Sequence, residues 1–179
     1  MSGSTPVYGL PYQDPLDPPN GPTLGQDIAE AVEAALLEAL GRKGYVGQHD
    51  RNTTSPGAGS ITTTETQVQA YTFDAVAGQR YKITAVQGVQ QDASGGSARI
   101  KLRWASGTSV STSSTLIGSI VGPCNTANVG SINTFHGTFV APSTGQMTVG
   151  VFMMRNTGTG GVISFGNADQ TNTILVEGV

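Results

Sequence analysis

The sequence is short of charge, and this shortage already excludes one class of partner. Charged residues make up 12% of the 179 residues, half of the ~25% that soluble domains usually carry. The net charge is −3, so the chain has no basic surplus with which to neutralise a phosphate backbone. We therefore expect no nucleic-acid partner.

Cysteine and long apolar runs are scarce as well. Cys124 is the only cysteine, which excludes an intrachain disulfide. We expect a small buried thiol; a contact with its copy across a symmetry axis and a catalytic nucleophile are the alternatives. The first residues lack the basic start and apolar core of a signal peptide, and no apolar run reaches ~18 residues. We therefore expect no membrane partner, and synthesis in a cytoplasm.

Motifs of known catalytic chemistry are also missing. The sequence contains no G-x-S-x-G elbow, phosphate-binding loop or zinc-protease motif. The two histidines, His49 and His136, lie far apart in the chain and form no metal-binding motif. We expect no enzymatic activity, no cofactor and no metal.

Glycine is abundant where charge is scarce, with 25 of 179 residues, twice the usual ~7%. A composition rich in glycine and threonine favours short strands joined by tight turns. Turns bearing Gly or Pro separate the candidate strands of residues 59–179, which are 60–73, 80–91, 97–105, 114–121, 131–140, 146–155, 161–166 and 173–178. This spacing predicts a mainly β fold, an antiparallel β-sandwich or jelly roll, preceded by an extended Pro-rich arm and one α-helix.

Residues 1–23 form the predicted arm and hold six of the nine prolines. Proline fixes φ and removes backbone donors, so we expect an extended segment without a core of its own. Apolar side chains on such a stiff strand suit docking into a partner's groove. The predicted anchoring residues are Val7, Tyr8, Leu10, Tyr12 and Leu16. A disordered tail is the alternative.

Residues 24–41 are predicted to form an amphipathic helix, followed by a linker over 42–58. Thr23 is a candidate N-cap and Gly41 a candidate C-cap. A helix this short is not stable alone in water. We therefore expect its apolar stripe to gather three chains in a parallel bundle or, alternatively, to pack on its own sandwich. The stripe consists of Leu24, Ile28, Val32, Leu36 and Leu40.

One candidate strand separates charge from apolar residues by strict alternation. Its apolar side chains, Ile100, Leu102 and Trp104, are predicted to face the core. The opposite face carries three basic residues, which are Arg99, Lys101 and Arg103. These are either a solvated face that guards against edge pairing or a contact for an acidic neighbour or an anionic ligand.

Strand 146–155 is apolar on both faces, which is typical of a strand that is buried on both sides. Met147, Val149, Val151 and Met153 share one face, while Phe152 and Met154 lie on the other. We predict a subunit interface through the first four; a strand covered by the helix or by a loop is the alternative. In strand 131–140, Phe135 and Phe139 are predicted to share one face, and His136 on the other face is expected at the surface or in an interface.

The first forty residues carry a recognisable pattern. It consists of Pro6-Val7-Tyr8-Gly9-Leu10-Pro11-Tyr12, then Asp14-Pro15 and Asp17-Pro18-Pro19, then Leu24-Gly25-Gln26-Asp27-Ile28-Ala29 leading into the helix. This pattern, followed by a Thr/Ser/Gly-rich body, resembles virion proteins of tailed phages that infect actinobacteria. The stretch 141–151 is also similar to the bodies of those proteins.

The resemblance implies a non-enzymatic structural protein on the virion surface, made in the host cytoplasm. The expected form is a homotrimeric knob, mounted through its arm as a minor tail or baseplate appendage. A capsid decoration or head-fibre protein is the alternative, and a carbohydrate-binding sandwich for host adsorption is a further one. The implied partners are the protein itself, a tail, baseplate or major capsid protein and, for adsorption, a host cell-surface glycan.

Overall fold

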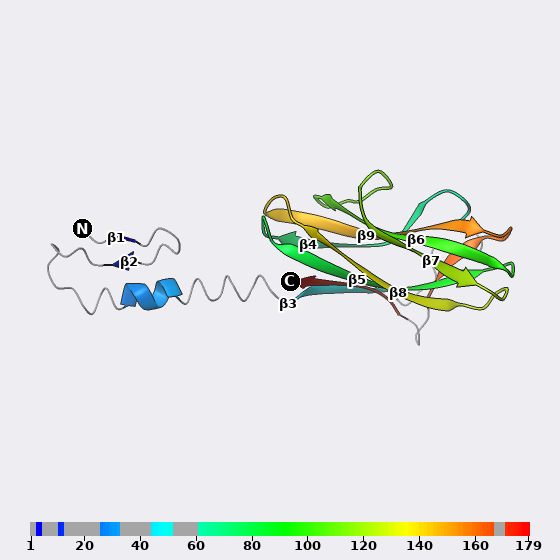
Figure 1. The fold of residues 1–179 in the computed structure, drawn as a ribbon, viewed down its shortest axis with the longest axis horizontal. Helices are drawn as coiled ribbons and strands as arrows, with labels where there is room; N and C mark the ends of the chain where they lie inside the picture. The colour runs from blue at the N-terminus through cyan, green and yellow to red at the C-terminus, as the bar shows by residue number, and fades with distance from the viewer. Residues whose placement is uncertain (1–2, 5–10, 13–25, 33–43, 52–60, 167–170) are drawn as a thin grey trace. The chain divides into compact units, whose positions relative to one another are not determined.

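The computed structural model describes residues 3–4, 11–12, 26–32, 44–51, 61–166 and 171–179. The chain divides into two compact units, Met1–Gly44 and Tyr45–Val179, both drawn in Figure 1. In the first unit, strands β1 (Gly3–Ser4) and β2 (Pro11–Tyr12) pair antiparallel. Residues 26–32 of the same unit are helical, within the helix predicted over 24–41.

The second unit is built from β-strands alone in its described residues. The strands are β3 (Gly44–Arg51), β4 (Thr66–Ala75), β5 (Arg80–Gln91), β6 (Gly96–Ser106), β7 (Thr115–Cys124), β8 (Ser131–Val140), β9 (Gly145–Thr157), β10 (Val162–Phe165) and β11 (Asn172–Gly178). All eight predicted strands are present, although the first begins at Thr66 instead of residue 60. Before it, Ile61 forms an isolated bridge with Val162.

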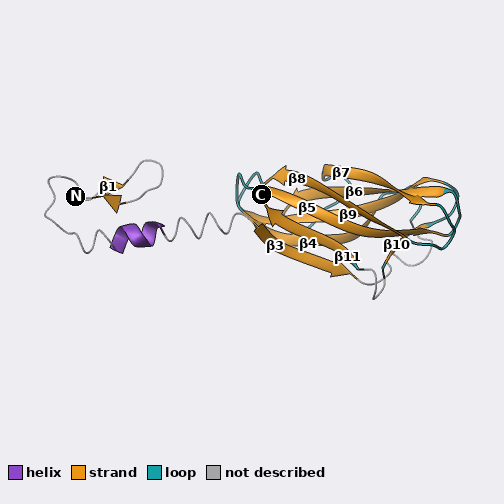
Figure 2. Cartoon of the chain, turned by 60° about the horizontal axis from the view of Figure 1, so that its bottom comes forward, coloured by secondary structure: helices purple, strands orange, loops and turns teal. Residues whose placement is uncertain are grey.

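These strands form two layers: Figure 1 shows β4, β9 and β6 above β5 and β3, and Figure 2 shows the strands running along the length of the unit. One sheet has the order β8-β5-β11-β3, with β10 continuing beside β5 past the end of β11, and the other has the order β4-β9-β6-β7. The pairs of β5 with β8, β10 and β11 are antiparallel, as are those of β6 with β7 and β9. With β10 and β11 taken as one broken strand, this order is that of a jelly roll, as the sequence predicted.

The core lies between the sheets and follows from alternation along each strand. On β5, Tyr81, Ile83 and Ala85 point inward and are at most 3% exposed. Aromatic rings meet from both sheets: Trp104 of β6 stacks on Phe139 of β8 with centroids 4.6 Å apart. The inward direction predicted for Trp104 is therefore confirmed, and Phe135 and Phe139, predicted to share a face, both lie in the core.

The predicted linker over 42–58 is wrong for residues 44–51, because these form edge strand β3. The segment lacks the apolar alternation that marks a strand, since Gly47 takes one inward position. The packing explains this glycine: a Cβ at Gly47 would lie 1.9 Å from the hydroxyl oxygen of Tyr71. Glycine here lets β3 approach the aromatic row that runs through Tyr71 and Phe73. The other linker residues lie outside the described ones.

Candidate interaction surface

The outer face of strand β6 carries the basic row predicted from the sequence. Arg99 is exposed, whereas the side chains of Lys101 and Arg103 are only 19% and 13% exposed. The two partly buried cations share one carboxylate, Glu65, which lies just before β4. The acidic neighbour of this row is therefore a residue of the same chain.

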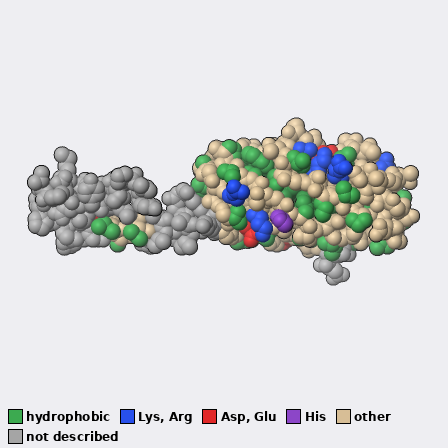
Figure 3. Space-filling model, in the orientation of Figure 1, with side chains coloured by type: hydrophobic (Ala, Val, Ile, Leu, Met, Phe, Trp, Pro, Cys, Tyr) green, Lys and Arg blue, Asp and Glu red, His purple; other side chains and the backbone are tan. Residues whose placement is uncertain are grey.

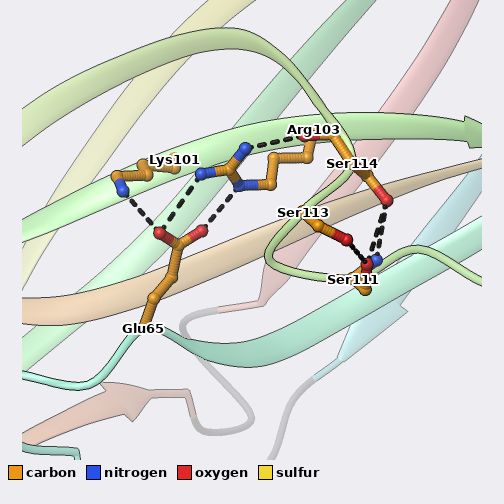
Figure 4. A network of polar contacts seen from close by, with 6 residues as sticks. All are labelled: Glu65, Lys101, Arg103, Ser111, Ser113 and Ser114. Atoms are coloured by element: carbon orange, nitrogen blue, oxygen red, sulfur yellow. Dashed lines mark hydrogen bonds and ion pairs between the residues drawn. The ribbon is translucent and has the colours of Figure 1, made fainter.

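Glu65 holds both cations through a fork of hydrogen bonds (Figure 4). Arg103 donates from Nε to Oε1 at 2.6 Å and from Nη2 to Oε2 at 3.2 Å, and Lys101 donates to Oε2. Burial alone would raise the pKa of Glu65, but the hydrogen bonds and charges of Arg103 and Lys101 outweigh it and lower that pKa. The site is thus a structural clamp on the sheet face in which two cations share one carboxylate, and Arg99 is the exposed cation of the row.

The clamp also fixes a loop, residues 107–114, that lies over strand β9. Arg103 donates from Nη1 to the carbonyl oxygen of Ser114 at 2.7 Å, which holds one end of the loop. At the other end, Thr148 donates from its hydroxyl to the carbonyl oxygen of Gly107 at 2.7 Å. Between them, Val110 is 7% exposed and packs on Gly150, where a Cβ would lie 2.6 Å from its Cγ1.

The subunit interface predicted through β9 is wrong, because its residues are buried within one chain. Met147, Val149, Val151 and Met153 are at most 1% exposed and belong to the core of a single chain. They therefore cannot meet another subunit. On the opposite face, Phe152 is 1% exposed beside the loop that carries Val110. The strand is apolar on both faces because loop 107–114 of the same chain covers its second face. This agrees with the alternative prediction of a strand covered by a loop.

Exposed hydrophobic side chains gather elsewhere, along strands β7 and β8. Seven large hydrophobic side chains are exposed among the described residues of Tyr45–Val179, and five of them lie between residues 116 and 140. These five are Leu116 (50% exposed), Val121 (46%), Val129 (56%), Ile132 (53%) and Val140 (46%). We call them the β7–β8 surface. The sequence did not reveal it, because exposure depends on which sheet face is covered.

Strands β7 and β8 lie at the edges of different sheets but run beside each other. A Cβ at Gly137 would lie 2.3 Å from Cγ2 of Ile117, so the side chain of Ile117 on β7 packs directly against the backbone of β8. The hydroxyl of Ser131 donates to the carbonyl oxygen of Pro123 at 3.0 Å. The β7–β8 surface therefore follows one edge of the sandwich, where the two sheets meet. His136 is exposed on β8, as predicted.

A second unusual feature lies inside the sandwich, where polar side chains occupy inward positions. Gln87 donates to the hydroxyl of Ser164 at 2.7 Å and to Oδ1 of Asn172 at 3.1 Å. Arg51 donates to the same hydroxyl, and burial lowers the pKa of this arginine. The network joins β3, β5, β10 and β11, so it ties the broken last strand to its neighbours. Its glutamine, serine and asparagine are at most 1% exposed.

Several predicted site residues belong to the N-terminal unit. Ile28 and Val32 lie in the helical segment 26–32 and are 37% and 40% exposed. Tyr12 lies in β2. The remaining residues of the arm and the stripe lie outside the described ones, and these are Val7, Tyr8, Leu10, Leu16, Leu24, Leu36 and Leu40.

Cys124 is buried at 1% exposure, as predicted for a small thiol. Burial raises its pKa, although a hydrogen bond from the backbone of Ala98 acts in the opposite direction. Within the described parts of the chain, no group of three or more His, Cys, Asp or Glu residues could hold a metal ion. Among the same residues, no helix has the length and apolar character needed to span a membrane.

No protein-family model and no curated protein matches this sequence. Among solved structures, the chain is similar to an insecticidal delta-endotoxin from Bacillus thuringiensis, with 10% identity, a TM-score of 0.40 and coverage of 74% of this chain and 19% of the toxin. It is also similar to the VP2 subviral particle of infectious bursal disease virus, with 7% identity, a TM-score of 0.47 and coverage of 76% and 32%.

A third similar structure is the carbohydrate-binding module of Cellvibrio mixtus lichenase 5A in complex with cellotriose. Here the identity is 16% and the TM-score 0.33, with coverage of 73% of this chain and 86% of the module. The chain thus spans less than a third of the toxin and about a third of the VP2 protein. With scores below 0.5, these similarities assign no function.

Proposed function

We propose that this protein is a non-enzymatic structural protein of a tailed-phage virion. In this proposal, the jelly roll forms a homotrimeric knob on the particle surface and the N-terminal arm anchors it. The mounting point is a minor tail or baseplate position, with capsid decoration as the competing position. The sequence pattern of the arm and helix supports the phage assignment.

The observation that carries this proposal is that the jelly roll has a core of its own. The buried hydrophobic cluster of the described residues runs from Ile61 to Val176 and includes no residue of Met1–Gly44. A sandwich with a core of its own supports a mounting role for the N-terminal unit. The acidic, proline-rich composition of the unit suits an extended segment that docks into a groove of a partner.

A carbohydrate-binding sandwich would present aromatic rings to solvent. Of the aromatic side chains in the described residues, only Tyr45 is among the large exposed ones. The single tryptophan, Trp104, has one face covered by Phe139. We therefore favour the structural role over host adsorption.

Deleting residues 1–22 tests the anchoring role in a phage that depends on this protein. The truncated chain is expected to keep the β-sheet spectrum and the oligomeric mass of the full protein but to be absent from purified particles. A control chain in which a Gly/Ser segment of equal length replaces the arm should behave in the same way. Normal incorporation of either chain would refute the anchoring role.

Quantifying copies per particle then separates the two mounting points. Hundreds of copies indicate capsid decoration, and tens or fewer indicate the tail.

A further inference from the structure

We propose that the β7–β8 surface is where the jelly-roll units of neighbouring copies of this chain contact one another. This inference rests on the proposed homotrimer and names the surface through which the bodies of the subunits meet. It replaces the contact expected through β9, whose side chains are buried in the core of one chain.

The first argument is the complete absence of charge along this edge. No Asp, Glu, Lys or Arg occurs between Arg103 and Arg155, a stretch that includes both β7 and β8. Exposed edge strands usually carry lysines, other charges or prolines that prevent pairing with other chains. Here β7 and β8 carry no charged side chain and a single proline, Pro123. Among exposed threonine, serine and histidine side chains they present Leu116, Val121 and Ile132, each close to half exposed. An uncharged edge that presents several large hydrophobic side chains is typical of a covered surface.

The second argument is the position of the nearest charges. On β5, Arg80 lies opposite Val140 and Lys82 lies opposite Thr138. On β6, Arg99 lies opposite Val121. Figure 3 shows basic side chains in separate groups, with hydrophobic and uncharged side chains on the surface between them. An uncharged centre with charges at its margin is the usual anatomy of a protein–protein interface.

The third argument favours a second copy of this chain over an unrelated partner. Permanent contacts between identical subunits are the most apolar interfaces and the most depleted in charge. An uncharged centre also lets identical surfaces meet without like-charge repulsion.

Site-specific photo-crosslinking of the full chain tests the inference directly. Ile132 is replaced by p-benzoylphenylalanine, and Gln67 is replaced in the same way as a control. Gln67 is exposed and lies on β4, at the opposite edge of the sheet from β7. We expect covalently linked chains from the Ile132 position, with the attachment point in the β7–β8 region of a second copy, and none from the Gln67 position.

Sedimentation of the unmodified chain accompanies this experiment. If the chain is oligomeric but position 132 yields no linked chains, the inference is wrong while the homotrimer stands. If the chain is monomeric at all concentrations, both are wrong.

A second measurement uses charge to disrupt the contact. The double variant Leu116→Asp, Ile132→Asp should raise the concentration at which copies associate by at least about tenfold, because buried unpaired carboxylates oppose association. The single variant Gln67→Asp, on β4 at the opposite edge of the sheet from β7, should leave that concentration unchanged. Circular dichroism confirms that each variant is folded. Equal association of the folded double variant and the wild type would overturn the inference.

Discussion

Replacing Glu65 with Gln removes the carboxylate that holds Lys101 and Arg103 on the outer face of β6. The substitution keeps the size of the side chain but leaves two cations, each less than 20% exposed, without their shared negative partner. The fork also positions Arg103 to donate to the carbonyl oxygen of Ser114. We therefore expect both the sheet face and the end of loop 107–114 to loosen.

The expected loss is about 2 kcal/mol of unfolding free energy. A hydrogen bond to a charged group contributes about 1.5–3 kcal/mol, whereas an exposed ion pair contributes roughly 0.2–1 kcal/mol. The Glu65 side chain and its two partners are at most 19% exposed, so the contribution of these pairs should lie nearer to that of a charged hydrogen bond than to that of an exposed ion pair. For a chain of this length, the loss corresponds to a drop in Tm of about 4–8 °C, measurable by calorimetry or circular dichroism.

The pH dependence provides an independent signature. The folded protein holds the pKa of Glu65 below its ordinary value, so its carboxylate stabilises the fold fully above the unfolded pKa of about 4.3. That contribution is lost as the pH falls through the lowered folded pKa. The stability gap between wild type and Glu65→Gln should therefore be full at neutral pH and close progressively in acid.

Glu177→Gln is the matched control. Glu177 pairs with Lys82 at 3.0 Å, but these side chains are 33% and 40% exposed, so its loss should cost less than about 1 kcal/mol. The reasoning fails if Glu65→Gln costs no more than Glu177→Gln, or if its stability gap does not change with pH.

A substitution in β9 tests the role of loop 107–114, and a labelling reaction tests the burial of the Cys124 thiol. Gly150→Ala places a Cβ 2.6 Å from Cγ1 of Val110, and this overpacking should lower the free energy of unfolding by about 1–3 kcal/mol. It should also raise the rate of hydrogen exchange in residues 107–114. An unchanged exchange rate there would contradict the covering role of the loop. Cys124, buried at 1% exposure with a raised pKa, should react with a thiol reagent only on unfolding, and stoichiometric labelling of the native protein at neutral pH would show that it is accessible.

The alternation of side chains in the sequence was sufficient to predict most of the strands of the sandwich. Ile100, Leu102 and Trp104 face inward and Arg99, Lys101 and Arg103 face outward, as the period of two requires. The strand 131–140 likewise buries Phe135 and Phe139 and exposes His136. These predictions succeed because a strand's faces are set locally, by the geometry of consecutive residues.

Strand β3 could not be predicted in this way. Its inward positions carry Gly47, His49 and Arg51, which fit only because Tyr71 fills the space beside Gly47 and Ser164 accepts from Arg51. Glutamines at positions 69, 87 and 91 are buried for a similar reason. Their partners come from strands distant in sequence, for example the carbonyl oxygen of His49 for Gln69.

The sequence by itself determined the mainly β fold, the positions of most strands and the buried state of Cys124. It also determined which side chains of β6 and β8 share a face. Only the tertiary structure decided what covers each outer face. It placed Glu65 against Lys101 and Arg103, laid Val110 over β9 and left Leu116 and Ile132 uncovered. The physical reason is that a strand's alternation defines two faces, whereas the occupant of each face depends on long-range contacts that a local pattern does not encode.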